Sequence, residues 1–279
     1  MNNKTKNDSA LPSTLDKNFL VDTHCHLHMA EYADDIDMVL ERSSLQGVKK
    51  IVTVGVDLTS SEIAVSLANK YKEVFATIGV HPHDIEGLRE EDYLALEKIY
   101  RDNSTVIVGF GEIGLDYFRN YSDPAQQRRH FRLQLDIAHT LKLPVVIHNR
   151  DADEDILTIL HQTKPLDYGG IMHCFSGDYS YAKKILDLGL LISIPGIVTF
   201  KKSTTLQEVA RHIPLTAIVL ETDGPYLSPQ PFRGKRNEPG YLVHTATKIA
   251  ELRQIDFSVV AKQTTNNAEK LFSMTKHNL

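Results

Sequence analysis

The sequence predicts an α/β protein folded as a single TIM-type (β/α)8 barrel, with distortion from the ideal symmetry allowed. The chain has 279 residues of which 42% are hydrophobic, enough to bury one barrel-sized core. Eight short apolar segments, rich in β-branched residues, alternate with segments of helical character. Polar side chains suited to binding metal recur where these apolar segments end.

The eight expected strands are mostly apolar throughout, which is typical of parallel strands covered on both faces. They are expected at 19–22, 50–56, 74–80, 105–110, 144–148, 169–173, 190–194 and 217–221. The clearest helix is expected over 125–142, where apolar residues recur at helical spacing among polar ones. A doubly wound open sheet shows the same alternation, so the placement of the polar residues has to decide between the two folds.

One domain is expected over 19–279, because no proline- or glycine-rich linker and no repeat divides this range. Residues 1–18 are interpreted as a flexible polar tail, since they lack the apolar run of a signal peptide. No apolar segment approaches the roughly 20 residues that span a bilayer, which excludes a membrane-integral protein. Cys25 and Cys174 are too few for a disulfide scaffold, and we expect two small buried residues in a reduced, cytoplasmic protein.

The net charge limits how this protein can bind nucleic acid. There are 31 Lys and Arg against 36 Asp and Glu, which gives a net charge of −5. An acidic chain does not hold nucleic acid or anionic lipid through its overall charge. Any binding of phosphate must therefore be local.

Polar residues gather at the ends of the expected strands. In a barrel the carboxyl ends of all strands meet at one mouth, whereas an open sheet spreads them along a line. Convergence into a single site therefore favours the closed barrel. The residues concerned are His24, His26, His81, Glu112, His148, His173 and Asp223, with His28 and His83 close by.

The motif DTHCH (22–26) suggests what such a site binds. In an extended chain His24 and His26 point the same way and Cys25 points opposite. Imidazole and carboxylate are ligands of Zn²⁺, Mn²⁺ and related ions. Six of these residues, His24, His26, Glu112, His148, His173 and Asp223, exceed the needs of one tetrahedral ion. Two divalent ions are therefore predicted, about 3.5–4 Å apart, with a carboxylate such as Glu112 able to bridge them.

Each residue also has a simpler interpretation when taken alone. A single HxH motif is often part of a core, Glu112 could cap a helix, and Asp223 before Gly-Pro could form a turn. Together, however, these residues would crowd the mouth with buried polar groups that only an ion or a substrate could satisfy.

Several longer motifs occur in a characteristic order between about residue 20 and residue 272. They are DTHCH, GVHPHD (79–84), GEIGLDYFR (111–119), PVVIHNRDA (144–152), HCFSG (173–177), ETDGPYL (221–227), GKRNEP (234–239) and NNAEKLF (266–272). Together they resemble the TatD-type metal-dependent hydrolases of the amidohydrolase superfamily. The resemblance implies a TIM-type barrel, a divalent-metal centre and DNase activity, commonly as a 3′–5′ exonuclease.

The resemblance also implies roles for individual residues. His24 and His26 would bind one metal, His148 and His173 would complete the second site, and Glu112 would bridge the two. Asp223 would bind metal and act as general base, and His81 would contact phosphate. Gly224 stands where the family often has Ala or Ser, a change that should not disturb ligation. The segment 105–116 contains no lysine, which separates this chain from relatives with a carboxylated-lysine bridge.

The expected substrate is DNA, entering as a single strand or a frayed end because a sunken metal centre cannot receive the middle of a rigid duplex. His81, His83, Arg150 and Arg236 are the predicted substrate-binding residues. Basic residues of the same face could grip the backbone: Arg119, Arg150, Lys201, Lys202, Arg233, Lys235 and Arg236. Arg236 could instead pair with Glu238 or Asp116. Aromatic residues after strand ends could stack terminal bases or simply shape loops: Tyr117, Phe118, Phe175, Phe200 and Tyr226.

Two other functions stay open at this stage. The same metal centre could hydrolyse an ester or amide, for example as an aminoacyl-tRNA deacylase. A non-catalytic, metal-stabilised binding protein is the alternative from another class. Mg²⁺, Mn²⁺ and Zn²⁺ all accept mixed nitrogen and oxygen ligands, so the sequence leaves the native metal open, as it does the oligomeric state.

Overall fold

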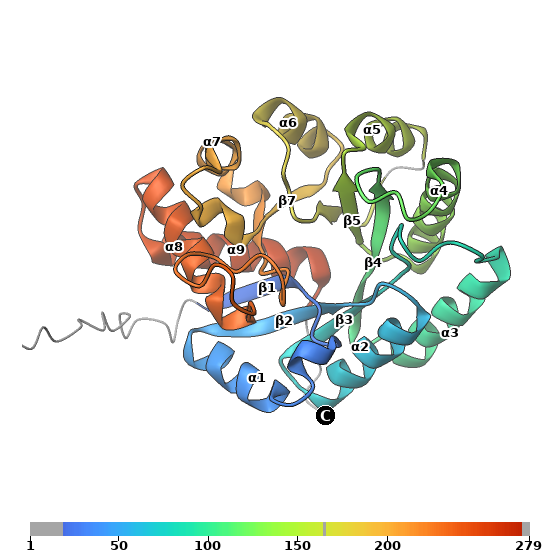
Figure 1. The fold of residues 1–279 in the computed structure, drawn as a ribbon, viewed down its shortest axis with the longest axis horizontal. Coiled ribbons are helices and arrows are strands. Elements are labelled where there is room, and N and C mark those ends of the chain that lie inside the picture. The colour runs from blue at the N-terminus through green and yellow to red at the C-terminus, as the bar shows by residue number, and fades with distance from the viewer. Residues whose placement is uncertain (1–18, 164–165, 275–279) are drawn as a thin grey trace, which may run out of the picture.

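Eight parallel strands form one sheet in the computed structural model, which describes residues 19–163 and 166–274 (Figure 1). The strands are β1 (Leu20–Cys25), β2 (Val48–Val54), β3 (Val74–Ile78), β4 (Ile107–Asp116), β5 (Val145–Arg150), β6 (Gly170–Met172), β7 (Leu191–Ile194) and β8 (Ile218–Leu220). Each strand pairs with the next one along the chain. The expected tail, 1–18, lies outside the described residues.

The sheet closes between β1 and β8 through a narrow seam. Cys25 and Gly224 form a single parallel bridge there. On either side of it, the N–H of Asp223 donates to the carbonyl of His24 (2.9 Å) and the N–H of His26 donates to the carbonyl of Gly224 (2.7 Å). The predicted (β/α)8 barrel is therefore confirmed. The distortion lies in this seam and in the three-residue strands β6 and β8.

Helices surround the barrel in Figure 1 and cover the outward faces of the strands. They are α1 (Ile36–Leu45), α2 (Leu58–Lys70), α3 (Tyr93–Asn103), α4 (Pro124–Leu141), α5 (Asp153–Gln162), α6 (Tyr179–Asp187), α7 (Thr204–His212), α8 (Leu242–Arg253) and α9 (Phe257–Phe272). Short 3-10 helices lie in the connections between strands and helices: η1 (Ala30–Tyr32), η2 (Glu90–Asp92), η3 (Gly196–Thr199), η4 (Leu215–Ala217) and η5 (Pro239–Tyr241). None of the helices within 19–163 and 166–274 has the length and apolar character to cross a bilayer.

The helix expected over 125–142 is α4, and its ends differ from the expectation by one residue. It starts where local chemistry favours a start. The side chain of Asp123 accepts the N–H groups of Ala125 (2.9 Å) and Gln126 (3.2 Å), and Pro124 occupies the first turn, where no backbone donor is needed.

Strand β4 differs most from the expectation, because it continues to Asp116 whereas the expected strand ends at residue 110. Two of its three glycines, Gly111 and Gly114, lie in the part beyond residue 110. Both have positive φ (156° and 146°), and a Cβ at Gly111 would lie 2.5 Å from the carbonyl of Val146 on β5. The glycines therefore let β4 approach β5 closely. As a result Glu112 lies inside a strand, beside the strand that carries His148.

Candidate metal centre

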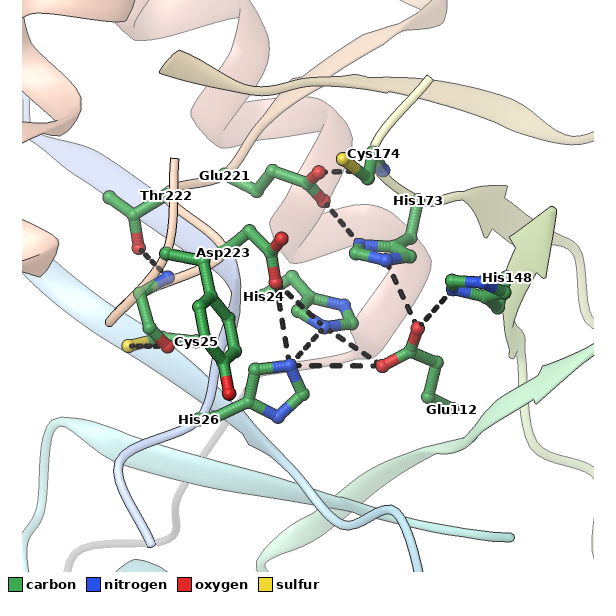
Figure 2. A network of polar contacts seen from close by, with 12 residues as sticks. His24, Cys25, His26, Glu112, His148, His173, Cys174, Glu221, Thr222 and Asp223 are labelled. Carbon is green, nitrogen blue, oxygen red and sulfur yellow. Dashed lines mark hydrogen bonds and ion pairs between the residues drawn. The ribbon is translucent and has the colours of Figure 1, made fainter. Parts of the chain in front are cut away.

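The predicted ligands meet at the carboxyl ends of the strands, inside the barrel mouth (Figure 2). His24 lies in β1, Glu112 in β4 and His148 in β5. His26, His173 and Asp223 directly follow β1, β6 and β8 or lie within three residues of them. His81 follows β3. Residues that are distant in sequence thus form one cluster, as the barrel model predicted.

Four of these residues form a first ligand group. The Nε2 atoms of His24 and His26 are 3.2 Å apart. Oε2 of Glu112 is 3.3 Å and 3.8 Å from them, and Oδ1 of Asp223 is 3.8 Å and 3.4 Å from them. A tetrahedral ion with ligand bonds of 2.0–2.2 Å requires ligand atoms about 3.4 Å apart. The group therefore fits a divalent ion.

Glu112 also faces a second group with its other oxygen. Oε1 is 2.7 Å from Nδ1 of His148, 3.1 Å from Nε2 of His173 and 3.6 Å from Nε2 of His81. The two oxygens of one buried carboxylate thus point to separate sets of imidazoles, which is the arrangement of a bridging ligand. Glu112 is the residue that joins the two halves of the centre.

Protein contacts alone leave this cluster poorly satisfied. The Nδ1 atoms of His24 and His26 are buried without a hydrogen-bond partner. The two facing Nε2 atoms can share only one proton between them. The ring of His24 also stacks on that of His173 with centroids 3.7 Å apart. Such a concentration of imidazole and carboxylate matches the donor set of a divalent cation.

The carboxyl groups of the centre are ionised and ready to bind metal. Burial raises the pKa of Glu112, but the imidazoles of His173, His81 and His24 more than offset this and hold it well below its usual value. Burial also acts to raise the pKa of Asp223. The hydrogen bond from His26 and the charge of His173 outweigh this effect, so the pKa is lowered overall. Both side chains therefore carry a negative charge near neutral pH.

Three further acidic residues support the predicted ligands, a role that was not expected from the sequence. The first is Glu221, which precedes Asp223 in the motif ETDGPY. Its Oε2 is 3.3 Å from Nδ1 of His173 and accepts the hydroxyl of Ser193 (2.6 Å), while its Oε1 accepts the N–H of Cys174 (2.6 Å). Glu221 thereby turns Nε2 of His173 toward the centre, as Figure 2 shows.

The second is Asp22, the first residue of DTHCH. Its Oδ1 accepts the N–H of Thr222 (2.9 Å) and its Oδ2 contacts the Thr222 hydroxyl (2.5 Å). Asp22 therefore ties β1 to the segment that carries Asp223. Complete burial raises the pKa of Asp22 to about 8, although the hydrogen bonds from Thr222 oppose this shift.

The third is Asp116, the last residue of β4. Its Oδ2 is 2.9 Å from Nε2 of His83 and 3.2 Å from Nε2 of His148, and its Oδ1 accepts the N–H of Arg119 (2.8 Å). All three acids lie beside ligands within the quoted motifs. Their position beside predicted ligands was the signal in the sequence that could have indicated this role. The sequence could not show which residues they contact, because those partners lie on other strands and loops.

His81 and His83 lie together at the mouth with different partners. Nδ1 of His81 accepts the N–H of His83 (3.1 Å), which leaves Nε2 of His81 as the protonated nitrogen of the neutral ring. Burial and the neighbouring His148 lower the pKa of His81 well below its usual value. His81 therefore presents a neutral N–H donor toward Glu112. His83 is held by Asp116.

The two predicted substrate-binding arginines have different surroundings. Arg236 donates to both oxygens of Asp35 (2.8 Å each) and to Glu238 (2.9 Å). The suggested pairing with Glu238 is thus observed, whereas the suggested pairing with Asp116 is replaced by Asp35. Arg150 is exposed, and its guanidinium lies 4.7 Å from the ring centroid of Phe118.

Two minor expectations can be compared with the structure. The suggested base-stacking role is wrong for Phe175, whereas Cys25 is a small buried residue, as expected. Phe175 is only 1% exposed and stacks on Tyr181, so it packs the interior. Sγ of Cys25 lies 3.5 Å from the carbonyl of Gly224, on the side away from the ligands. Cys174 is unpaired as well, but it is only partly buried, which differs from the expectation of two buried cysteines.

A (β/α)8 barrel with imidazoles and carboxylates clustered at its mouth places this protein in the class of metal-dependent hydrolases. The chain belongs to the family described as TatD related DNase, whose model matches residues 21–273.

Relatives and solved structures agree with this assignment. The chain is 40% identical over 253 residues to the uncharacterized metal-dependent hydrolase YabD of Bacillus subtilis (91% of this chain, 98% of the relative). It is 38% identical over 263 residues to the uncharacterized metal-dependent hydrolase YcfH of Escherichia coli K12 (91% and 96%). The crystal structure of YJJV, a TatD homolog from Escherichia coli K12, matches with a TM-score of 0.87 at 28% identity (91% and 98%).

Proposed function

We propose that this hydrolase is a divalent-metal-dependent deoxyribonuclease that removes nucleotides from strand ends, with 3′–5′ polarity. The observation that carries the proposal is Glu112, whose two oxygens face two ligand groups. Two-metal sites are suited to phosphodiester hydrolysis, because the two ions can stabilise the charge on both the attacking and the leaving oxygen. The name of the family supports DNA as the substrate.

The residues can be assigned to two ion sites. His24, His26 and Asp223 would hold one ion, His148 and His173 the other, and Glu112 both. Bound Mg²⁺, Mn²⁺ or Zn²⁺ would supply Lewis acidity and would make water a stronger acid. Because two divalent ions outweigh the charges of Glu112 and Asp223, the centre would be locally positive and would attract a phosphodiester although the whole chain is acidic.

The chain's own residues would then handle the protons and the phosphate. Asp223 is ionised and lies in the first ligand group, so it can accept a proton from the attacking water. The N–H at Nε2 of His81 can donate to a phosphoryl oxygen, since Nδ1 is already occupied. His83 and Arg150 lie further out on the rim and are proposed to contact the substrate.

The depth of the centre favours cleavage from strand ends. The ligands are buried within the barrel mouth, with Glu112 3% and His24 0% exposed. A strand end or frayed single strand can enter such a mouth, whereas the middle of a rigid duplex cannot. For the compartment we propose the cytoplasm, a setting that the unpaired Cys25 and Cys174 favour.

The substrate is tested by comparing DNA, RNA, aminoacyl-tRNA and small phosphoesters, with added Mn²⁺ and with chelator. We expect metal-dependent hydrolysis of linear single-stranded DNA and much slower cutting of circular single-stranded DNA. Faster turnover of aminoacyl-tRNA would favour the esterase alternative, and equal rates on circles and linear strands would exclude end-directed action. Asp223→Asn with metal still bound should lose most of the activity. Full activity in that variant would remove Asp223 as general base.

A further inference from the structure

Four exposed side chains lie on the loop after β4 and at the end of β5, on the same side of the barrel as the metal centre: Phe118, Arg119, Tyr121 and Arg150, called here the rim cluster. Phe118 is 56% and Tyr121 is 62% exposed, the largest exposed fractions among the aromatic side chains of the described residues. The guanidinium of Arg150 lies 4.7 Å and that of Arg119 lies 5.7 Å from the ring centroid of Phe118. A partly exposed aromatic ring and two cations are thus presented together to solvent.

The two arginines of the rim cluster lack acidic partners. Throughout 19–163 and 166–274, neither Arg119 nor Arg150 forms an ion pair with a carboxylate. Arg236, by contrast, is paired with Asp35 and Glu238, and Arg128 with Asp155. The rim cluster therefore offers positive charge that is free to meet an anionic ligand.

Hydrogen bonds through Asp116 connect the rim cluster to the metal centre. Asp116 contacts the ligand His148 through Oδ2 and accepts the N–H of Arg119 through Oδ1. The N–H of Tyr117 also donates to the carbonyl of Arg150 (2.9 Å), which pins the loop after β4 to the end of β5. His83, bonded to the same Asp116, meets the ring of Tyr121 edge-on at 4.8 Å.

This combination of groups suits single-stranded nucleic acid. Aromatic faces stack on unpaired bases of any sequence, and adjacent arginines bind the phosphates. A base within a duplex has no free face for such stacking. Charge also limits the path of the strand, because the acidic first turn of α5 (Asp153, Glu154 and Asp155) begins three residues after Arg150 and repels phosphate.

We propose that the rim cluster is the binding site for the nucleotide adjoining the scissile phosphate. Phe118 stacks on its base, while Arg119 and Arg150 bind its phosphate. This inference rests on the proposed nuclease function and adds to it a specific subsite for an unpaired base. The inference also separates two contributions to binding. Stacking on Phe118 requires a base, whereas the arginines require only the phosphate backbone of the strand.

The test measures binding of the full-length, metal-loaded protein to two probes by fluorescence anisotropy. One probe is a short phosphorothioate oligodeoxythymidine, which resists hydrolysis, and the other is an abasic strand of the same length and charge. Phe118→Ala should weaken binding of the first by about 5- to 150-fold and leave the second unchanged. Phe118→Trp should restore binding, because tryptophan retains an aromatic face.

The arginines have a different expected signature. The double variant Arg119→Ala/Arg150→Ala should weaken binding of both probes. It should also reduce the slope of log affinity against log salt by roughly 0.7 for each lost phosphate contact. Tyr168→Ala and Arg101→Ala are matched controls that change an exposed aromatic residue before β6 and an arginine in the last turn of α3. Both should bind like the unmodified protein.

The outcomes separate this inference from the proposed function. Unchanged oligodeoxythymidine binding in Phe118→Ala would overturn the stacking subsite, even where the unmodified protein hydrolyses DNA. Equal losses for the two probes would also overturn it, since the base would then play no part. Failure of the unmodified protein to hydrolyse any DNA would overturn the nuclease proposal, while the binding measurements would still decide whether the rim cluster holds a strand.

Discussion

The carboxylates behind the ligands determine how the imidazoles of this centre point. Glu221 holds Nδ1 of His173, and Asp116 holds Nε2 of His148. Such outer partners fix ring orientation and raise the basicity of the ligand nitrogen. Their effect on metal binding is therefore expected to be large, although they contribute no ligand atom to either group.

Asp116→Asn tests this effect, because asparagine keeps the shape of the side chain and removes its charge. We expect Mn²⁺ to bind about 10- to 100-fold more weakly at the group that includes His148. Isothermal titration calorimetry measures the affinity. Asp155→Asn is the matched control, because Asp155 contacts Tyr117 and Arg128 and no ligand. Identical Mn²⁺ affinities in the two variants would show that Asp116 does not support the centre.

Among the elements, ion pairs join α1 and its N-terminal end to the loop before α8, at the barrel mouth. Asp35, Arg42, Arg236 and Glu238 form a ring of alternating charges, in which Arg42 donates to Glu238 (2.8 Å) and to Asp35 (3.0 Å). The adjacent Asn237 donates its side-chain amide to the carbonyl groups of Thr222 and Tyr226 (2.8 Å and 2.6 Å). The ring therefore anchors the loop that follows Asp223.

The pH dependence of stability should reveal this ring. The hydrogen bond from Arg236, opposed by slight burial and assisted by Arg42, lowers the pKa of Asp35 from 3.8 to about 2. A carboxyl with a depressed pKa stabilises the fold above its unfolded pKa, and this contribution is lost as the pH falls through the folded pKa. Asp35→Asn should thus lower the free energy of unfolding by about 1 kcal/mol near neutral pH, since the pair is partly exposed.

Urea unfolding of Asp35→Asn and the unmodified protein at several pH values measures the difference. The difference in free energy of unfolding between the two proteins should decrease as the pH is lowered below about 4 toward 2. Asp102→Asn, which removes an exposed partner of Lys98 on α3, serves as the control and should change little. A gap that stays constant across this range would contradict the assignment.

At the scale of the whole molecule, the centre exists only in the closed barrel. Its candidate ligands come from β1, β4 and β5 and from the segments after β1, β6 and β8. An unfolded chain does not hold these side chains together. Divalent ions should therefore bind the folded state selectively and stabilise it.

Removing metal should lower stability measurably. An ion at about 100 times its dissociation constant adds about 2.7 kcal/mol to the free energy of unfolding. For a domain of this size, that corresponds to a rise in Tm of roughly 5–10 °C. Differential scanning calorimetry with Mn²⁺ and after chelation measures the shift. Glu112→Gln should lose most of it, whereas an equal Tm with and without Mn²⁺ in the unmodified protein would argue against a preformed ion site.

Particular elements show how far the sequence carries the fold. The apolar, β-branched runs and the period of α4 follow from local chemistry, so their existence and order could be predicted. The end of β4 could not, because Gly111 and Gly114 look like breaks until the close approach of β5 explains them. Arg236 is a similar case, since its partner Asp35 lies about two hundred residues away along the chain.

The residue types and their spacing by themselves predicted the parallel barrel, six candidate metal ligands and their gathering at one mouth. These features follow from hydrophobic patterning and from the convergence of parallel strands. Only the tertiary structure decided that Glu221, Asp22 and Asp116 support the ligands, that Arg236 is paired and that Arg150 stays free beside Phe118. Those contacts join side chains from different strands and loops, and a local pattern in the sequence carries no information about which of them meet.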